Sequence, residues 1–199
     1  EWQKWEFQAR NDKYFINISS LGLDAVTADN VIKMKQLKFI PKGLTYYASL
    51  FYTLARYKFP KLRIAFDEHQ IEKEITLIAI CNGIYYGGGI GIAPQAIFDD
   101  GLFDVCLVDK IPKYQIPFLM TKLLKGEHDK FPFVKFYRTN YLKVECDQNL
   151  VCNVDGEIIN ANRFEFKLIK EGLNIIKPKV LIKNKWLILF VFFFFLNIF

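Results

Sequence analysis

The feature that most constrains the fold is a period of two in the apolar residues, which recurs from residue 62 onward. Leu62, Ile64 and Phe66 alternate with polar or small residues, and residues 142–147 and 163–168 repeat the pattern. Successive side chains of a β-strand point to opposite faces of a sheet, so the pattern predicts strands with one buried face. The chain has 199 residues and is 52% hydrophobic, which is ample for a core. We therefore expect an antiparallel sheet assembly with two or three inserted helices.

Local patterns predict the individual elements. Helices are expected at 24–35 with Asp24 as the N-cap, at 44–57, and at 111–125. Turns are expected at 20–22 and 67–70, where short polar or glycine-containing segments interrupt the apolar pattern. The remaining apolar segments predict strands at 14–19, 62–66, 71–81, 102–109, 142–147, 150–154, 163–170 and 173–176.

The two ends of the chain differ from this body. Residues 1–13 form a lead-in that the patterns leave unassigned. Residues 186–196 are apolar without interruption, but a membrane-spanning helix needs roughly 17–25 such residues. The tail at 179–199 is thus either an interfacial membrane anchor or non-native coding sequence beyond a domain end near Pro178. The abrupt change in composition favours the second interpretation.

The chain begins at Glu1 and has no basic segment followed by an apolar stretch, so we expect no signal peptide and a C-terminal piece of a longer protein. The four cysteines form no Cys-x-x-Cys pair, and the chain has two histidines, so a zinc site is not expected. Cys81, Cys106 and Cys146 lie in apolar contexts typical of buried thiols, which indicates a reducing cytosol.

Positive charge is the next feature, since the formal net charge is +6 and basic residues cluster at 33–42 and 58–63. Three interpretations are open. A solvated surface is the default. Attraction to an anionic membrane ranks second, because the basic residues are interleaved with Tyr, Phe and Leu. Nucleic acid ranks last, because no nucleic-acid-binding signature accompanies the charge, and we expect no such partner.

A glycine-rich and acidic segment spans residues 81–104. Gly87, Gly88 and Gly89 fit neither of the common phosphate-binding patterns, GxxxxGK[ST] and GxGxxG. The run is either a flexible loop or a place where the backbone approaches a ligand or a partner domain closely. Asn82 precedes it and can tie the loop through side-chain hydrogen bonds.

Two Asp-Gly pairs follow. Asp100-Gly101 lies between apolar segments, and a hairpin turn is the favoured local interpretation, with a cation loop as the alternative. Asp155-Gly156 also predicts a turn, but Asp155 and Glu157 are two residues apart, which places both carboxylates on one side of an extended backbone. Two like charges side by side are costly unless a metal or a proton is shared between them. Such a carboxylate could accept the proton of an attacking hydroxyl.

These segments form an ordered series that resembles the C-terminal domain of the bacterial diacylglycerol kinase and lipid kinase family, to which sphingosine and ceramide kinases are related. The resemblance covers about residues 14–178, and residues 15–25 look like the start of that domain. The motifs that carry it are Asn82-Gly83, Gly87-Gly88-Gly89, Ala93-Pro94-Gln95-Ala96, residues 99–104, Gly126-Glu127-His128 and Val154-Asp155-Gly156-Glu157.

The resemblance implies an ATP-dependent kinase of two domains, with a β-sandwich-like C-terminal domain and the active site in the cleft between the two. Asp155 would be the general base for the lipid hydroxyl, and Glu157 would support the magnesium network. Asp100 would be a structural Mg²⁺ ligand, with the carbonyls of Ile97 and Leu102 completing the shell.

The same resemblance places Asn82, Gly87, Gly88 and Gly89 on the wall of the cleft. The family's GGDGT-type ATP loop is missing from this chain. The N-terminal ATP-binding domain is therefore an absent partner, and the isolated chain is expected to be inactive. A membrane lipid substrate, a position at the cytoplasmic membrane surface and a homodimer complete these expectations.

Three functions thus compete. The first is the substrate-side half of a kinase for diacylglycerol or a similar membrane lipid. The second is a lipid- or membrane-binding module without catalysis. The third is a kinase of the NAD kinase type with a soluble substrate, and the series from Asn82 to Asp104 argues against it.

Overall fold

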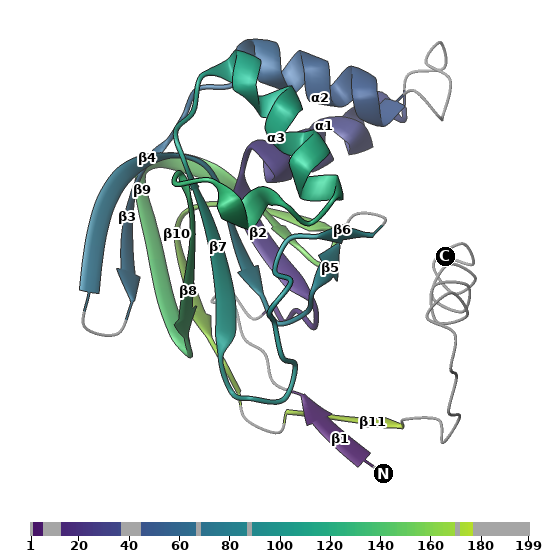
Figure 1. The fold of residues 1–199 in the computed structure, drawn as a ribbon, viewed down its shortest axis with the longest axis vertical. Coiled ribbons are helices and arrows are strands. Elements are labelled where there is room, and N and C mark those ends of the chain that lie inside the picture. The colour runs from purple at the N-terminus through teal and green to yellow at the C-terminus, as the bar shows by residue number, and fades with distance from the viewer. Residues whose placement is uncertain are drawn as a thin grey trace.

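The computed structural model describes residues 2–5, 13–36, 45–66, 69–86, 89–169 and 172–176. Its largest unit is an antiparallel sheet of seven strands, and three α-helices gather on one side of that sheet (Figure 1). The fold is α+β and mainly β, which confirms the fold class that the period-two pattern predicts.

The strands of this sheet follow the order β10-β9-β2-β4-β7-β8, and β3 pairs with both β4 and β9. Every neighbouring pair is antiparallel, as expected. The bounds are Ile18–Gly22 (β2), Lys61–Phe66 (β3), His69–Cys81 (β4), Phe103–Asp109 (β7), Val134–Thr139 (β8), Tyr141–Val154 (β9) and Glu157–Lys167 (β10).

Two short strands share one position in the sheet. β4 has 13 residues and β9 has 14, so each is long enough to hold two partners end to end. β2 pairs with the C-terminal parts of both, through pairs such as Leu21–Ile78 and Leu21–Cys152. β3 pairs with their N-terminal parts, as in Ile64–Ile71 and Ile64–Val144. This arrangement places residues 18–22 in the middle of the sheet, although they are far in sequence from β9.

Two smaller ladders complete the strands. β1 (Trp2–Trp5) pairs with β11 (Leu173–Ile176), so part of the unassigned lead-in lies beside the last expected strand. β5 (Tyr85–Tyr86) and β6 (Ile90–Gly91) form a short hairpin. The tail at 179–199 and the loop around Pro41 lie outside the described residues. Among the described helices, none combines the length and the apolar character that crossing a bilayer requires.

The sheet separates two hydrophobic clusters. On one face, Ile78 and Ile80 of β4 join a cluster with β3, β7, β9 and β10; on the other, Leu77, Ala79 and Cys81 face the helices. The second half of β4 is buried on both faces, which explains why its sequence is a continuous apolar run rather than an alternating one. All four cysteines are buried free thiols, which confirms the expectation for Cys81, Cys106 and Cys146.

The three expected helices are present, with changed ends. α2 spans Thr45–Arg56 and confirms the prediction closely. α3 begins only at Ile116, after the 3-10 turn η2 (Lys113–Gln115), because Pro117 suits the first turn of a helix and not its interior. A second 3-10 turn, η3, spans His128–Lys130.

The prediction for residues 20–24 was partly wrong. Ser20, Leu21 and Gly22 belong to β2 and not to a turn, and α1 (Leu23–Met34) follows β2 directly. Asp24 is therefore inside the first turn of α1, and Gly22 stands at the N-cap. Gly22 has φ 111°, and a Cβ there would lie 2.7 Å from backbone atoms of Thr76 and Leu77. Only glycine allows a strand to turn into a helix this abruptly.

Residues 142–154 form one strand rather than the two that were expected. The pairing of β9 with β10 jumps from Ala161–Leu150 to Arg163–Glu145, so the polar residues 146–149 bulge out of register. The polar interruption in the sequence is thus a β-bulge. Residues Asp100-Gly101 also differ from expectation, because they precede β7 without joining two paired strands.

Asp24 is a buried acid in this fold. Its Oδ1 atom has neither solvent contact nor a hydrogen-bond partner within the described structure, and its Oδ2 atom accepts a 3.4 Å hydrogen bond from the Tyr86 hydroxyl. Burial raises the pKa of Asp24 from its ordinary value of 3.8 to about 6, and hydrogen bonds offset only part of that effect.

The folded protein should therefore lose stability as the pH rises from about 4 to about 6, because folded Asp24 keeps its proton longer than unfolded Asp24. At about 1.4 kcal/mol per pKa unit, the loss is up to about 3 kcal/mol. Denaturant unfolding of Asp24→Asn across this range should lack that component, whereas Asp129→Asn, an exposed carboxylate, should retain it. Equal pH slopes in wild type and Asp24→Asn would contradict the assignment.

Candidate active site

The Asp155-Gly156 turn is the two-residue loop that joins β9 to β10. Asp155 has φ 46° and Gly156 has φ 99°, and Val154 pairs directly with Glu157. Positive φ at both central residues is typical of a type I′ hairpin, for which Asp-Gly is a preferred sequence. The predicted turn is therefore confirmed, and its geometry turns the Asp155 side chain back toward the sheet.

The Asp155 carboxylate is held by backbone N–H groups at the start of β2. Ile16 N donates to Oδ2 at 2.5 Å, Asn17 N to Oδ2 at 3.0 Å, and Ile18 N to Oδ1 at 2.8 Å. The Asp155 N–H in turn donates to the Ile18 carbonyl at 3.1 Å. Three successive amide donors around one carboxylate fix its position and supply charge-assisted hydrogen bonds. They also make Asp155 an anchor for β2.

The same segment is tied to the glycine-rich region through Asn17. The Asn17 carbonyl accepts the N–H groups of Asn82 at 2.9 Å and Gly83 at 3.0 Å, and the Asn17 amide donates to the Tyr85 carbonyl at 2.8 Å. The side-chain amide of Asn82 donates a hydrogen bond to the Ile16 carbonyl at 3.1 Å. The structure therefore links Asp155 and Asn82 through residues 16–18. The side chain of Asn82 bonds to Ile16 and not to the glycine loop that it was expected to tie.

Asn17 is one residue that the sequence analysis missed. It lies between the two predicted motifs and bonds to both, yet in the sequence it is one polar residue inside an apolar stretch. The available signal was its place in residues 15–25, which resemble the start of the domain. No local pattern indicates that its amide reaches Tyr85, 68 positions away.

The glycine wall is described only in part. Gly87 and Gly88 lie outside the described residues. Gly89 has φ 104°, donates to the Tyr86 carbonyl at 3.2 Å, and would have an open space beside an added Cβ. Glycine is needed at position 89 because the turn between β5 and β6 requires this positive φ. Close approach applies instead to Gly83, where a Cβ would lie 2.0 Å from Asn17 Oδ1 and 2.8 Å from the Phe98 ring.

The second acidic turn lies beside Arg138. Asp100 Oδ1 accepts the Leu102 N–H at 3.0 Å, and Oδ2 forms an ion pair with the Arg138 guanidinium. Asp104 lies 3.4 Å from Arg138 Nε, while its own Oδ2 is buried without a partner in the described structure. Burial raises the pKa of Asp104, Arg138 counters this, and the Asp100 charge adds to the rise.

The two acidic turns stand apart. One register row crosses the sheet through Ile18, Cys81, Asp104 and Arg138, with Asp155 bonded to Ile18 at one end. Asp155 follows β9 and Arg138 lies in β8, so four strand steps of about 4.8 Å separate them along the sheet, or roughly 19 Å. Glu157, on the β9–β10 side, forms an exposed ion pair with Lys13 at 2.7 Å. Asp100 and Glu157 would therefore serve different cations.

Donor chemistry near Asp100 fits a hard cation. Two carboxylates lie close together, one with an unpartnered buried oxygen, and Mg²⁺ prefers oxygen ligands. Arg138 supplies positive charge at the same place and would compete with such an ion. Within the described ranges, no group of three or more His, Cys, Asp and Glu side chains converges on a common point.

Comparison with known families identifies the domain. Residues 17–177 match the family described as "YegS C-terminal NAD kinase beta sandwich-like domain", which is most of the chain. The chain therefore belongs to the YegS C-terminal domain family, as the ordered series of motifs indicates. The match begins at Asn17, the residue that joins the two halves of the candidate site.

Named relatives agree with this family. The chain is 28% identical over 169 residues to "Probable lipid kinase YegS-like" of Shewanella frigidimarina, covering 84% of this chain and 53% of that protein. It is 28% identical over 178 residues to a diacylglycerol kinase of Staphylococcus saprophyticus, covering 89% of this chain and 57% of that protein. The chain thus spans little more than half the length of these relatives.

Solved structures show the same fold. A crystal structure of a diacylglycerol kinase from Bacillus anthracis aligns with a TM-score of 0.57 and 15% identity over 90% of this chain and 55% of that chain. A second crystal structure from the same organism aligns with a TM-score of 0.63 and 19% identity, covering 90% of this chain and 57% of that chain. At these identities the likeness concerns the fold alone.

Gly83→Ala should destabilise the site by about 1–3 kcal/mol, because the new methyl group would overlap Asn17 Oδ1 and the Phe98 ring. Urea unfolding of Gly83→Ala, Asn17→Ala and the double variant measures this. Removal of the Asn17 side chain should relieve the closest contact, so the two losses should be less than additive. Strict additivity would mean that Gly83 and Asn17 do not touch as described.

Proposed function

We propose that this chain is the substrate-side domain of an ATP-dependent lipid kinase that phosphorylates diacylglycerol or a similar membrane lipid. The observation that carries the proposal is the fixed Asp155 carboxylate beside the Asn82-Gly83 segment, in a family whose named relatives are lipid and diacylglycerol kinases. The ATP-binding half would be an N-terminal domain, because the matched relatives are almost twice as long as the matched region.

In the proposed reaction, the lipid hydroxyl attacks the γ-phosphorus of ATP and its proton passes to Asp155. A new oxygen–phosphorus bond forms while the bond to ADP breaks, and the developing charge requires positioning and neutralisation. The Asp155 carboxylate suits the base role because three N–H groups hold it in one orientation before substrate arrives. Asn82 and Gly83 hold the neighbouring backbone through Asn17.

Mg²⁺ would support this chemistry by neutralising phosphate charge. Asp100, with the carbonyls of Ile97 and Leu102, would hold a structural ion, four strands away from Asp155 along the sheet. The unpartnered oxygen of Asp104 supports that assignment. Glu157 would act near Asp155, after separation from Lys13. A homodimer remains a prediction that no contact in the structure bears on.

A membrane-surface location is supported by the outer side of α3. Tyr114, Phe118 and Leu124 are 78%, 56% and 64% exposed. Lys122 and Lys125 lie on the same helix and its cap. Aromatic and aliphatic side chains with adjacent lysines suit an anionic lipid interface. The same feature is what a lipid-binding module without catalysis would use, and the Asp155 variant separates the two functions.

Asp155→Asn in the full-length protein should lower kcat for lipid phosphorylation by about 10²–10⁴-fold, because an amide cannot take the proton. The Asp155 carboxylate also anchors β2, so thermal unfolding must be measured on the same sample. Asp129→Asn, which removes an exposed carboxylate in η3 away from the site, is the control for charge. A loss of activity that only follows the loss of folded protein would make Asp155 an anchor without a catalytic role.

Mg²⁺ should raise the thermal stability of the wild-type chain, by about 1.4 kcal/mol at roughly ten times its Kd. Asp100→Asn should remove this effect. Arg138→Gln should enhance it, because the guanidinium no longer competes for Asp100 and Asp104. Differential scanning calorimetry with and without Mg²⁺ measures each shift. Indifference of both the wild type and Arg138→Gln to Mg²⁺ would exclude a cation at this turn.

A further inference from the structure

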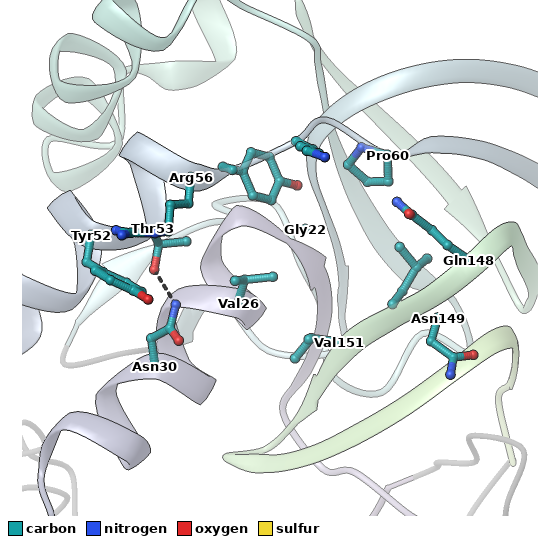
Figure 2. Close-up of a pocket in the computed structure, with 13 residues that line it drawn as sticks. Gly22, Val26, Asn30, Tyr52, Thr53, Arg56, Pro60, Gln148, Asn149 and Val151 are labelled. Atoms are coloured by element: carbon teal, nitrogen blue, oxygen red, sulfur yellow. Dashed lines mark hydrogen bonds between the residues drawn. The ribbon is translucent and has the colours of Figure 1, made fainter.

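A pocket of about 270 Å³ opens between α1, the C-terminal turn of α2 and the bulged part of β9 (Figure 2). Gly22, at the end of β2, lies on its wall. Asp155 is bonded to Ile18 at the opposite end of the same strand, about 13 Å away at 3.3 Å per residue. This pocket is therefore separate from the candidate active site.

The charge of the pocket has one sign. Arg56 and Lys58 lie on it, and none of the described residues that line it is an Asp or a Glu. Several acids on the flanking elements pair with other cations: Asp29 with Lys33, Glu72 with Lys61, Glu74 with Lys110, and Asp147 with Arg63. Asp24 of α1 is the acid whose charge acts on Tyr57, which lines the pocket. Within the described part of the chain, Arg56 and Lys58 thus have no carboxylate partner.

Arg56 is held ready to bind an anion. Its guanidinium carbon lies 4.3 Å from the centre of the Tyr52 ring, so the cation lies over the ring. The N–H groups of a guanidinium match the oxygens of a phosphate or carboxylate in a bidentate manner. Attraction between the guanidinium and the negative C-terminal end of the α2 dipole accounts for part of the position of Arg56. It does not account for the position of Lys58, which lies beyond the end of α2.

The remaining polar groups suit a neutral polyol. The Asn30 amide donates to Thr53 Oγ1 at 2.8 Å, which leaves the Thr53 hydroxyl hydrogen free to donate (Figure 2). Gln148, in the part of β9 that is out of register with β10, contributes a second side-chain amide on the opposite wall, whereas the Asn149 amide points away from Arg56 and Asn30 (Figure 2). Amides and hydroxyls both donate and accept, as the hydroxyls of a polyol require.

Size and shape narrow the ligand class further. The volume is slightly below the range of about 300–1,000 Å³ for pockets that enclose drug-sized ligands, so a headgroup-sized molecule fits. Two cations match a phosphomonoester, which carries about −1.5 to −2 charges near neutral pH. A nucleotide base would need an aromatic face to stack on, and Arg56 already covers that of Tyr52.

We propose that this pocket binds a phosphomonoester attached to a small polyol, with Arg56 and Lys58 on the phosphate and the amides of Asn30 and Gln148 on the hydroxyls. The ligand is either a free polyol phosphate or the headgroup of a phosphorylated lipid, since both present the same chemistry. Binding of this kind does not depend on the kinase function proposed above.

Isothermal titration calorimetry of the whole chain with glycerol 3-phosphate, and with inorganic phosphate as competitor, tests the proposal. Arg56→Gln should weaken binding at least about tenfold, because a charge-assisted bidentate contact is lost. Gln148→Glu, which places a carboxylate on the pocket wall, should also weaken binding. Lys167→Gln, an exposed lysine at the far end of β10, should stay within about twofold of wild type.

Co-sedimentation with phosphatidylcholine vesicles, with and without phosphatidic acid, distinguishes the two sources of the ligand. If recruitment of the protein to vesicles requires both phosphatidic acid and Arg56, the ligand is the lipid headgroup. If the protein binds glycerol 3-phosphate but is not recruited to vesicles, the ligand is the free molecule. Absence of binding in both experiments would overturn the proposal. An equal loss in Arg56→Gln and Lys167→Gln would also overturn it, because that result reflects net charge and not this pocket.

Discussion

Three N–H groups at the start of β2 converge on the Asp155 carboxylate, and the arrangement of the candidate site depends on that contact. It joins the β9–β10 hairpin to β2, whose first residues in turn hold Asn82 and Gly83 through Asn17. Three segments far apart in the chain thereby meet around one charged group. These contacts make Asp155 an anchor for β2, and the base role proposed for Asp155 would use the same fixed orientation.

Polar groups on this domain are distributed along and across the central strands. Asp155 lies at the N-terminal end of β2, and the pocket that contains Arg56 lies at its C-terminal end. Asp100 and Asp104 lie across the sheet, beside Arg138. The stiff sheet holds these places at set separations, while its buried faces carry the two hydrophobic clusters.

Much of the candidate site was open to prediction, because Asp155-Gly156 and Asn82-Gly83 are recognisable as short motifs whose residues have few conformational alternatives. The cation assignment for Asp100, Ile97, Leu102 and Glu157, and the cleft role of Gly87 and Gly88, stay predictions. Asn17 and Arg138 were not found, since each acts through a partner contributed by a distant segment. The partnership of Asp100 with Arg138 depends on the pairing of β7 with β8, which has no signature in either segment alone.

The sequence by itself determined the three α-helices, many of the strands and which face of most of them is buried, because side-chain periodicity follows directly from local backbone geometry. It did not predict β1, β5, β6 or β8. It also determined the two Asp-Gly turns as places of special backbone conformation. Tertiary structure alone decided that β2 and β3 share one position in the sheet, that residues 146–149 lie out of register with β10, and that the Asp24 Oδ1 atom is buried in the first turn of α1. Those outcomes depend on pairing between distant segments, whose energies come from contacts that no short stretch of sequence contains.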